Sequence, residues 1–165
     1  MRVASNTIAA VARRALPTLV ALALLAGCAR TSGSVHPPSA CTGGATADRV
    51  AAIRVALAKA PGPVALRDGT RISDCLARLA DSGDVQTVGS MMLALTQRLA
   101  DEASGAAPDQ ALTQLGYVIG AVQRGAAHAP GVDSELVRRL EQELAAVDTG
   151  SAAYRAGERA GRATG

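Results

Sequence analysis

Few residues in this chain have the types and spacing that chemistry requires. The candidates are three cysteines and two histidines: Cys28, Cys41, Cys75, His36 and His128. His36 with Cys41 and Cys75 would offer a set of zinc ligands. Zinc sites and reactive thiol pairs usually carry a paired spacing such as Cys-x-x-Cys, which is missing here. We therefore expect neither a metal site nor a reactive thiol pair.

Catalytic motifs are missing as well. The chain contains no Gly-x-Ser-x-Gly, no His-Glu-x-x-His and no P-loop ending in Gly-Lys-Ser/Thr. A mixed site of His128 with Asp133 and Glu135 can be drawn, but a solvated loop histidine before Pro130 is the simpler interpretation. We predict that the protein is not an enzyme and binds no cofactor.

Length and composition bound the remaining possibilities. The chain has 165 residues, which suits one domain, and a formal net charge of +3. Its aromatic fraction is only 1%. Proteins that bind RNA or single-stranded DNA stack bases on aromatic rings, so we expect no nucleic-acid partner.

The N-terminus has the three zones of an export signal. Arg2, Arg13 and Arg14 supply the positive charge, and the run from Ala15 to Leu25 supplies an apolar core too short to span a bilayer. The sequence Leu25-Ala26-Gly27-Cys28 follows and resembles the lipobox of bacterial lipoproteins at all four positions. The alternative is an uncleaved signal anchor with a chance cysteine.

The resemblance implies that residues 1–27 are removed and that Cys28 carries the lipid. Several acyl chains hold a protein stably on a membrane, whereas one chain holds it marginally. No later stretch approaches 18 apolar residues, so we expect an anchored protein that does not span the membrane. It would lie on the extracytoplasmic side of the cell membrane. In a Gram-negative source, Ala29 after the lipidated cysteine would favour the outer membrane.

Cleavage would also change the net charge of the protein. The signal segment holds three of the 17 basic residues and no acidic one, so the mature chain would have 14 basic and 14 acidic residues. The apparent basic character thus belongs to the export signal. The single Lys59 and the abundant alanine give the mature part a weak resemblance to the many small uncharacterised lipoproteins of high-GC bacteria, which implies no activity.

Lipidation of Cys28 would leave Cys41 and Cys75 as one possible pair. Disulfides persist on the exported side of a bacterial membrane, so we predict a Cys41–Cys75 disulfide. Closing a loop of this length stabilises a fold by roughly 3–4 kcal/mol in the chain-entropy model.

The mature chain divides by composition into three parts. Residues 28–46 are rich in Ser, Thr, Gly and Pro and predict a flexible tether after the lipidated cysteine. Residues 47–148 predict the folded domain. Residues 149–165 predict a flexible tail, whose Arg155, Arg159 and Arg162 would form a basic stripe if the tail were helical.

Helical periodicity dominates the domain. Apolar stripes and breakers predict helices at 47–60, 74–80, 84–103, 109–126 and 134–148. Such helices bury their stripes against one another, so we predict an all-α fold, a small helical bundle of about four to five helices. On helix 109–126 we place Gln114 and Tyr117 on the polar face.

One segment departs from this period. Residues 63–72 alternate around Asp68-Gly69, which is a favoured turn pair for a β-hairpin. Because an isolated hairpin is marginal in water, we favour an ordered loop packed by Val64, Leu66 and Ile72.

These features predict a structural or protein-interaction module of the cell envelope. Its partners would be the membrane, through the lipid on Cys28, and an envelope protein or polymer. The alternative is a small-molecule or lipid-binding carrier with a cavity between the helices. A third possibility, an envelope hydrolase, would need a cleft that joins His128 and Asp133 to a hydroxyl.

Overall fold

The computed structural model describes residues 36–127 and 132–165, and the side chains of residues 132–134 are not described. Residues 1–27, Cys28, the first part of the expected tether and His128 therefore lie outside the described residues. Over the described part the chain forms seven helices and no strand: α2 (Ser39–Thr42), α3 (Thr46–Leu57), α4 (Ile72–Leu76), α5 (Ser82–Ala103), α6 (Pro108–Ala126), α7 (Val132–Gln142) and α8 (Ala152–Thr164). The predicted all-α fold is confirmed.

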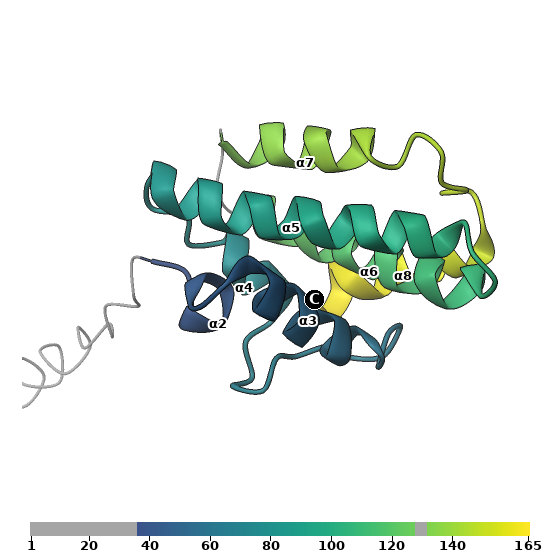
Figure 1. Cartoon of the computed structure of the whole chain (residues 1–165), viewed down its shortest axis with the longest axis horizontal. Helices are drawn as coiled ribbons and strands as arrows, with labels where there is room; N and C mark the ends of the chain where they lie inside the picture. The colour runs from purple at the N-terminus through teal and green to yellow at the C-terminus, as the bar shows by residue number, and fades with distance from the viewer. Residues whose placement is uncertain (1–35, 128–131) are drawn as a thin grey trace, which may run out of the picture. The chain divides into compact units, whose positions relative to one another are not determined.

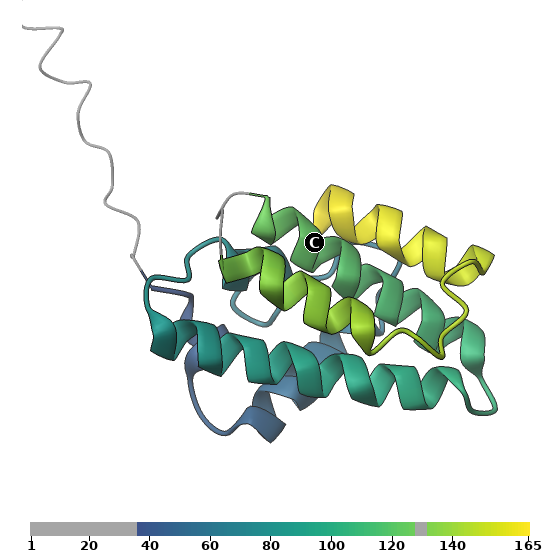
Figure 2. The same cartoon turned by 90° about the horizontal axis from the view of Figure 1, so that it is seen from above.

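Helix α6 is the centre of the bundle. It packs against α4, α5, α7 and α8, while α2 and α3 pack on α5. Figure 1 shows α7 on one side of α5 and the short N-terminal helices on the other, and Figure 2 shows α8 lying along α6. The core is aliphatic apart from the buried rings of Tyr117 and Tyr154.

The two long helices begin at local signals. The side chain of Asp81 caps α5 by accepting a hydrogen bond from the amide of Asp84 at 2.9 Å. Pro108 lies at the start of α6, where its missing N–H removes no helical hydrogen bond. The predicted stripes of both helices are buried: Val88, Met92, Leu95 and Leu99 on α5, and Leu112, Leu115, Ile119 and Val122 on α6.

The C-terminal segment differs from its prediction. Residues 149–165 were expected to be a flexible tail, and this is wrong, because residues 152–164 form α8 and pack on α6 more extensively than any other helix pair. The helix starts at Ser151, whose hydroxyl accepts a hydrogen bond from the amide of Tyr154 at 3.2 Å. Tyr154, Gly157 and Gly161 then lie buried on one face at helical spacing.

Glycines allow the backbones of α6 and α8 to touch. A Cβ atom added to Gly157 would overlap the carbonyl oxygen of Thr113 and lie 2.9 Å from the amide nitrogen of Tyr117. A Cβ atom at Gly161 would overlap the carbonyl oxygen of Tyr117 in the same way. Gly116 and Gly120 of α6 face the backbone of α8 reciprocally. We call this contact the glycine seam, and it has no room for a side chain larger than hydrogen.

The seam covers the face of α6 that we predicted to be polar. Gln114 and Tyr117 are buried there, so their predicted exposure is wrong. The hydroxyl oxygen of Tyr117 accepts a hydrogen bond from the amide of Val64 at 3.1 Å and lies 3.0 Å from the hydroxyl oxygen of Thr164. One buried phenol thus joins α6, α8 and the loop before α4, and its polar atom is satisfied.

The N-terminal side of the domain is also better ordered than predicted. Cys41 of α2 and Cys75 of α4 form the predicted disulfide, with their Cα atoms 5.5 Å apart and both side chains fully buried. The guanidinium of Arg49 donates hydrogen bonds to the carbonyl oxygens of Thr42 and Gly44. The domain therefore includes residues 36–46, which we had assigned to the tether.

The segment 63–72 is an ordered loop, as we favoured. Val64, Leu66 and Ile72 are buried, and the amide of Leu66 donates to the carbonyl oxygen of Thr70 at 2.8 Å. Gly69 has φ 83°, a conformation that a residue with a side chain rarely adopts.

A substitution at the seam should separate α8 from the bundle. We expect Gly157→Leu to lower the free energy of unfolding by about 3 kcal/mol, because the added side chain meets backbone that cannot move aside. Ala163→Leu on the exposed face of α8 is the matched control and should leave stability close to that of the original protein. Chemical denaturation measures both. Equal stability of the two variants would contradict the seam.

Candidate functional site

The structure describes some of the residues that the candidate metal and catalytic sites would use. Cys41 and Cys75 are joined to each other, so neither offers a thiolate for zinc beside His36. Glu135 pairs with Arg138 and Arg139 on the surface of α7, which lowers the pKa of its carboxyl to about 2. Its partners in the imagined mixed site, His128 and the side chain of Asp133, lie outside the described residues.

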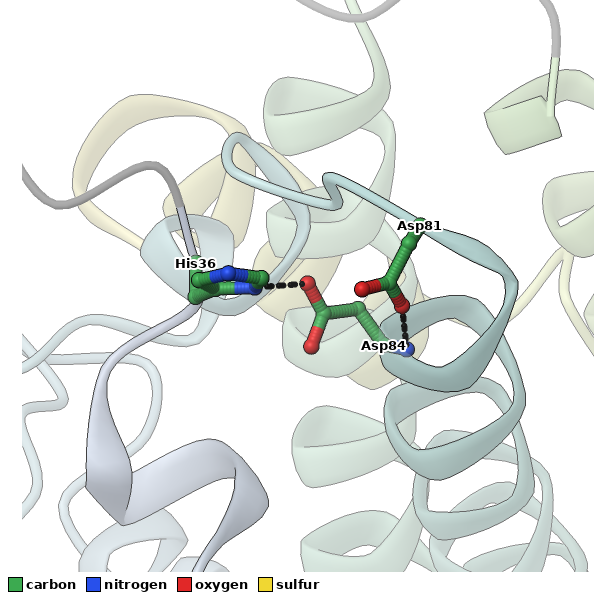
Figure 3. A group of neighbouring side chains, drawn as sticks. All are labelled: His36, Asp81 and Asp84. Carbon is green, nitrogen blue, oxygen red and sulfur yellow. Dashed lines mark hydrogen bonds and ion pairs between the residues drawn. The ribbon is translucent and has the colours of Figure 1, made fainter.

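His36 takes part in a cluster with Asp81 and Asp84, which we call the His36 cluster (Figure 3). The imidazole Nδ1 lies 2.9 Å from Oδ2 of Asp84, and that oxygen also accepts a hydrogen bond from the amide of Ala80. Asp81 is the cap of α5, and Asp84 follows in its first turn. The preference for capping and acidic residues at a helix start thus accounts for two carboxylates beside His36.

The cluster behaves as an ion pair. The hydrogen bond from His36 and the charge of the imidazolium lower the pKa of Asp84, while the hydrogen bond and charge of Asp84 raise the pKa of His36 above 6.5. The three potential ligand atoms lie within 4.8 Å of one another and could offer a cation two oxygens and a nitrogen. Nothing else in the described part of the chain points to an ion there. In the structure the ion pair of this cluster holds His36 against the start of α5.

A pocket of about 360 Å³ lies beside Tyr154, and we call it the Tyr154 pocket. Ligand pockets usually measure about 300–1,000 Å³, so this one suits a small molecule. Its lining comes from α6, from α7 and the segment after it, and from α8: Ile119, Gln123, Glu141, Leu144, Ala145, Thr149, Tyr154 and Glu158.

The pocket combines an apolar surface with carboxylates. Burial is the main cause that raises the pKa of the Tyr154 phenol to about 12, and the charges of Glu158 and Glu141 add to it. Glu158 forms an ion pair with Arg162 at 2.6 Å, whereas the carboxylate of Glu141 has no hydrogen-bond partner among the described residues. The phenol therefore stays protonated at neutral pH beside a negative surface.

Helix α3 provides a third surface feature. Its predicted residues Val50, Ile53 and Leu57 are buried, but the opposite face is also mostly apolar. That face consists of exposed alanines, one valine that is 71% exposed and, among them, the exposed carboxylate of Asp48; its apolar members are Ala47, Ala51, Ala52, Val55 and Ala58. A helix that is apolar on both sides suits contact with a partner.

Sequence reasoning missed the Tyr154 pocket and the His36 cluster because it assigned Tyr154 to a tail and His36 to a tether. A signal for α8 was present. Gly157, Gly161 and Gly165 repeat every four residues, and Gly116 and Gly120 repeat in the same way on the helix at 109–126. Matching stripes of small residues on two helices indicate a close packing contact.

The features together define a small, disulfide-linked, all-α domain. Comparison with protein-family models, with curated proteins and with solved structures finds no match to this chain. None of the helices that the structure describes is both long and apolar enough to cross a membrane.

The ion pair of His36 should be visible by titration. The pKa of His36 is raised when the domain is folded, so the pair stabilises the domain below about pH 6.5 and this contribution is lost as the pH rises through the folded pKa. The pKa of Asp84 is lowered, so its contribution is lost as the pH falls below about 3.8.

We expect Asp84→Asn to return the pKa of His36 toward 6.5, as measured by NMR titration of the imidazole. Asp101→Asn, near the other end of α5, is the control and should leave it raised. An unchanged pKa in Asp84→Asn would rule out the pair.

Proposed function

We propose that this protein is a lipid-anchored module on the extracytoplasmic side of a bacterial membrane, where it contacts another envelope protein. The resemblance of Leu25-Ala26-Gly27-Cys28 to a lipobox supports the anchor. The buried Cys41–Cys75 disulfide supports an exported location, because such bonds persist in oxidising compartments. We assign no catalytic role to the described residues.

The observation that carries this proposal is that His36, eight residues after Cys28, already contacts the folded domain through Asp84. The segment from Cys28 to His36 advances eight residues, which can extend by at most about 29 Å at 3.6 Å per residue. The disulfide and the Arg49 hydrogen bonds hold the next residues in the domain. A lipid on Cys28 would therefore keep the domain close to the membrane surface.

The exposed face of α3 is the surface that we propose for the contact. Helices that lie on membranes carry Lys or Arg on the polar face and Trp, Phe or Leu on the apolar one. Helix α3 exposes alanines and Val55, and Arg54 is paired with Glu102 at 2.6 Å. Small side chains allow another helix to approach closely, as they do at the glycine seam. An apolar helix of a protein therefore fits this face better than a bilayer.

The alternative of a small-molecule carrier is supported by one observation, the Tyr154 pocket. This pocket is lined by α6, by the end of α7 and the segment after it, and by α8, and its lining includes two carboxylates. It suits a small polar molecule better than a lipid.

The anchor is tested with the full-length chain in a bacterial host given a labelled fatty acid. We expect the original protein to carry the label and to remain with the membrane fraction, and Cys28→Ser to lose the label. The double variant Cys41→Ser with Cys75→Ser is the control, because it changes cysteines but should keep the label. A labelled Cys28→Ser protein would overturn the anchor.

The contact surface is tested with a photo-crosslinking residue at position 55 and, as the control, at the exposed position 138 on α7. We expect one exported protein to be captured at position 55 and not at position 138. Ala51→Glu on the same face should reduce that capture several-fold, because it places a charge in the contact. Identical products at both positions, or no effect of Ala51→Glu, would reject this surface.

A further inference from the structure

The Tyr154 pocket has two kinds of surface. Ile119 from α6 and Leu144 after α7 provide aliphatic lining, while Glu141 and Glu158 provide carboxylates. A molecule that fits has a short hydrocarbon part and one or two polar groups.

The charge of the pocket lining determines whether a ligand with a positive or a negative group would bind. Two carboxylates are partly offset by the single guanidinium of Arg162, which already binds Glu158. Glu141 is left without an ion-pair partner among the described residues. An anion would be repelled here, whereas a cation would gain a charge-assisted hydrogen bond.

Tyr154 is the aromatic residue of the pocket lining. Its side chain is buried, with only 4% of the residue exposed, and it lines the pocket. Its hydroxyl has no hydrogen-bond partner among the described residues, and it is not one of their buried polar atoms that lack a partner, so the oxygen is open to solvent. An ammonium group in the pocket could donate a hydrogen bond to this oxygen.

We propose that the Tyr154 pocket binds a small organic cation, an ammonium group that carries a short hydrocarbon chain. The ammonium lies between the carboxylate of Glu141 and the hydroxyl of Tyr154. The hydrocarbon part packs against Ile119 and Leu144. This site shares no residue with the proposed lipid anchor or with the α3 face. The experiments that test those proposals therefore do not test this one.

Three probes of equal chain length test the sign of the charge on the full-length protein: pentylamine, pentanol and pentanoate. Pentylamine is a cation at neutral pH, pentanol is neutral and pentanoate is an anion. We expect pentylamine to shift the NMR signals of the Tyr154 ring in a saturable way at millimolar concentration. Pentanol should bind more weakly, and pentanoate should produce no shift. An equal response to pentylamine and pentanoate, or none to pentylamine, would overturn the proposal.

Two variants test the residues. Glu141→Gln should weaken pentylamine binding about fivefold, which corresponds to the loss of one partly exposed ion pair of about 1 kcal/mol. Glu143→Gln is the matched control, because its carboxylate lies 3.3 Å from the side-chain amide of Gln97 and does not line the pocket. Tyr154→Phe keeps the ring but removes the hydroxyl and should also weaken binding, here followed by calorimetry. Equal losses for Glu141→Gln and Glu143→Gln would exclude a role for Glu141.

Discussion

The close contact between the backbones of α6 and α8 is the constraint on which the rest of the domain depends. At Gly157 and Gly161 a single Cβ atom would overlap the carbonyl oxygens of α6. This contact stabilises the fold through many small dispersion interactions between two helices that lie unusually near each other. This contact buries Tyr117, whose hydroxyl then orders the loop at Val64. It also places Tyr154 beside α6, which forms one wall of the pocket.

A second set of constraints acts at the other end of the described chain. The Cys41–Cys75 disulfide joins α2 to α4, and Arg49 satisfies the carbonyl groups between α2 and α3. His36 adds an exposed ion pair to the start of α5. Exposed pairs of this kind contribute little to stability, but this one holds His36 against the start of α5. These contacts make the residues from His36 onward part of the folded domain.

The predictions from the sequence were correct where they depended on local signals such as caps, prolines and apolar stripes. The helices at 84–103 and 109–126 have caps, a proline at the start and apolar stripes, and each is present within about one or two residues of its prediction. Sequence reasoning failed at α8, because the buried face of this helix is built mainly from Ala and Gly, a composition that suggests a flexible tail although its Arg residues repeat at helical spacing. It also misplaced Tyr117, since the polar face of a helix cannot be recognised as buried unless the helix that covers it is known.

By itself, the sequence determined the all-α class, the main helices, the ordered loop at 63–72 and the pairing of two cysteines. These depend on periodicity, turn residues and the small number of possible partners, all of which are properties of neighbouring residues or of composition. Only the tertiary structure decided that the C-terminal segment belongs to the core and that Glu141 and Tyr154 line one pocket. The physical reason is that a glycine contributes nothing to a hydrophobic pattern. Its effect is the space that it leaves for another backbone, and that space has meaning only when both helices are in place.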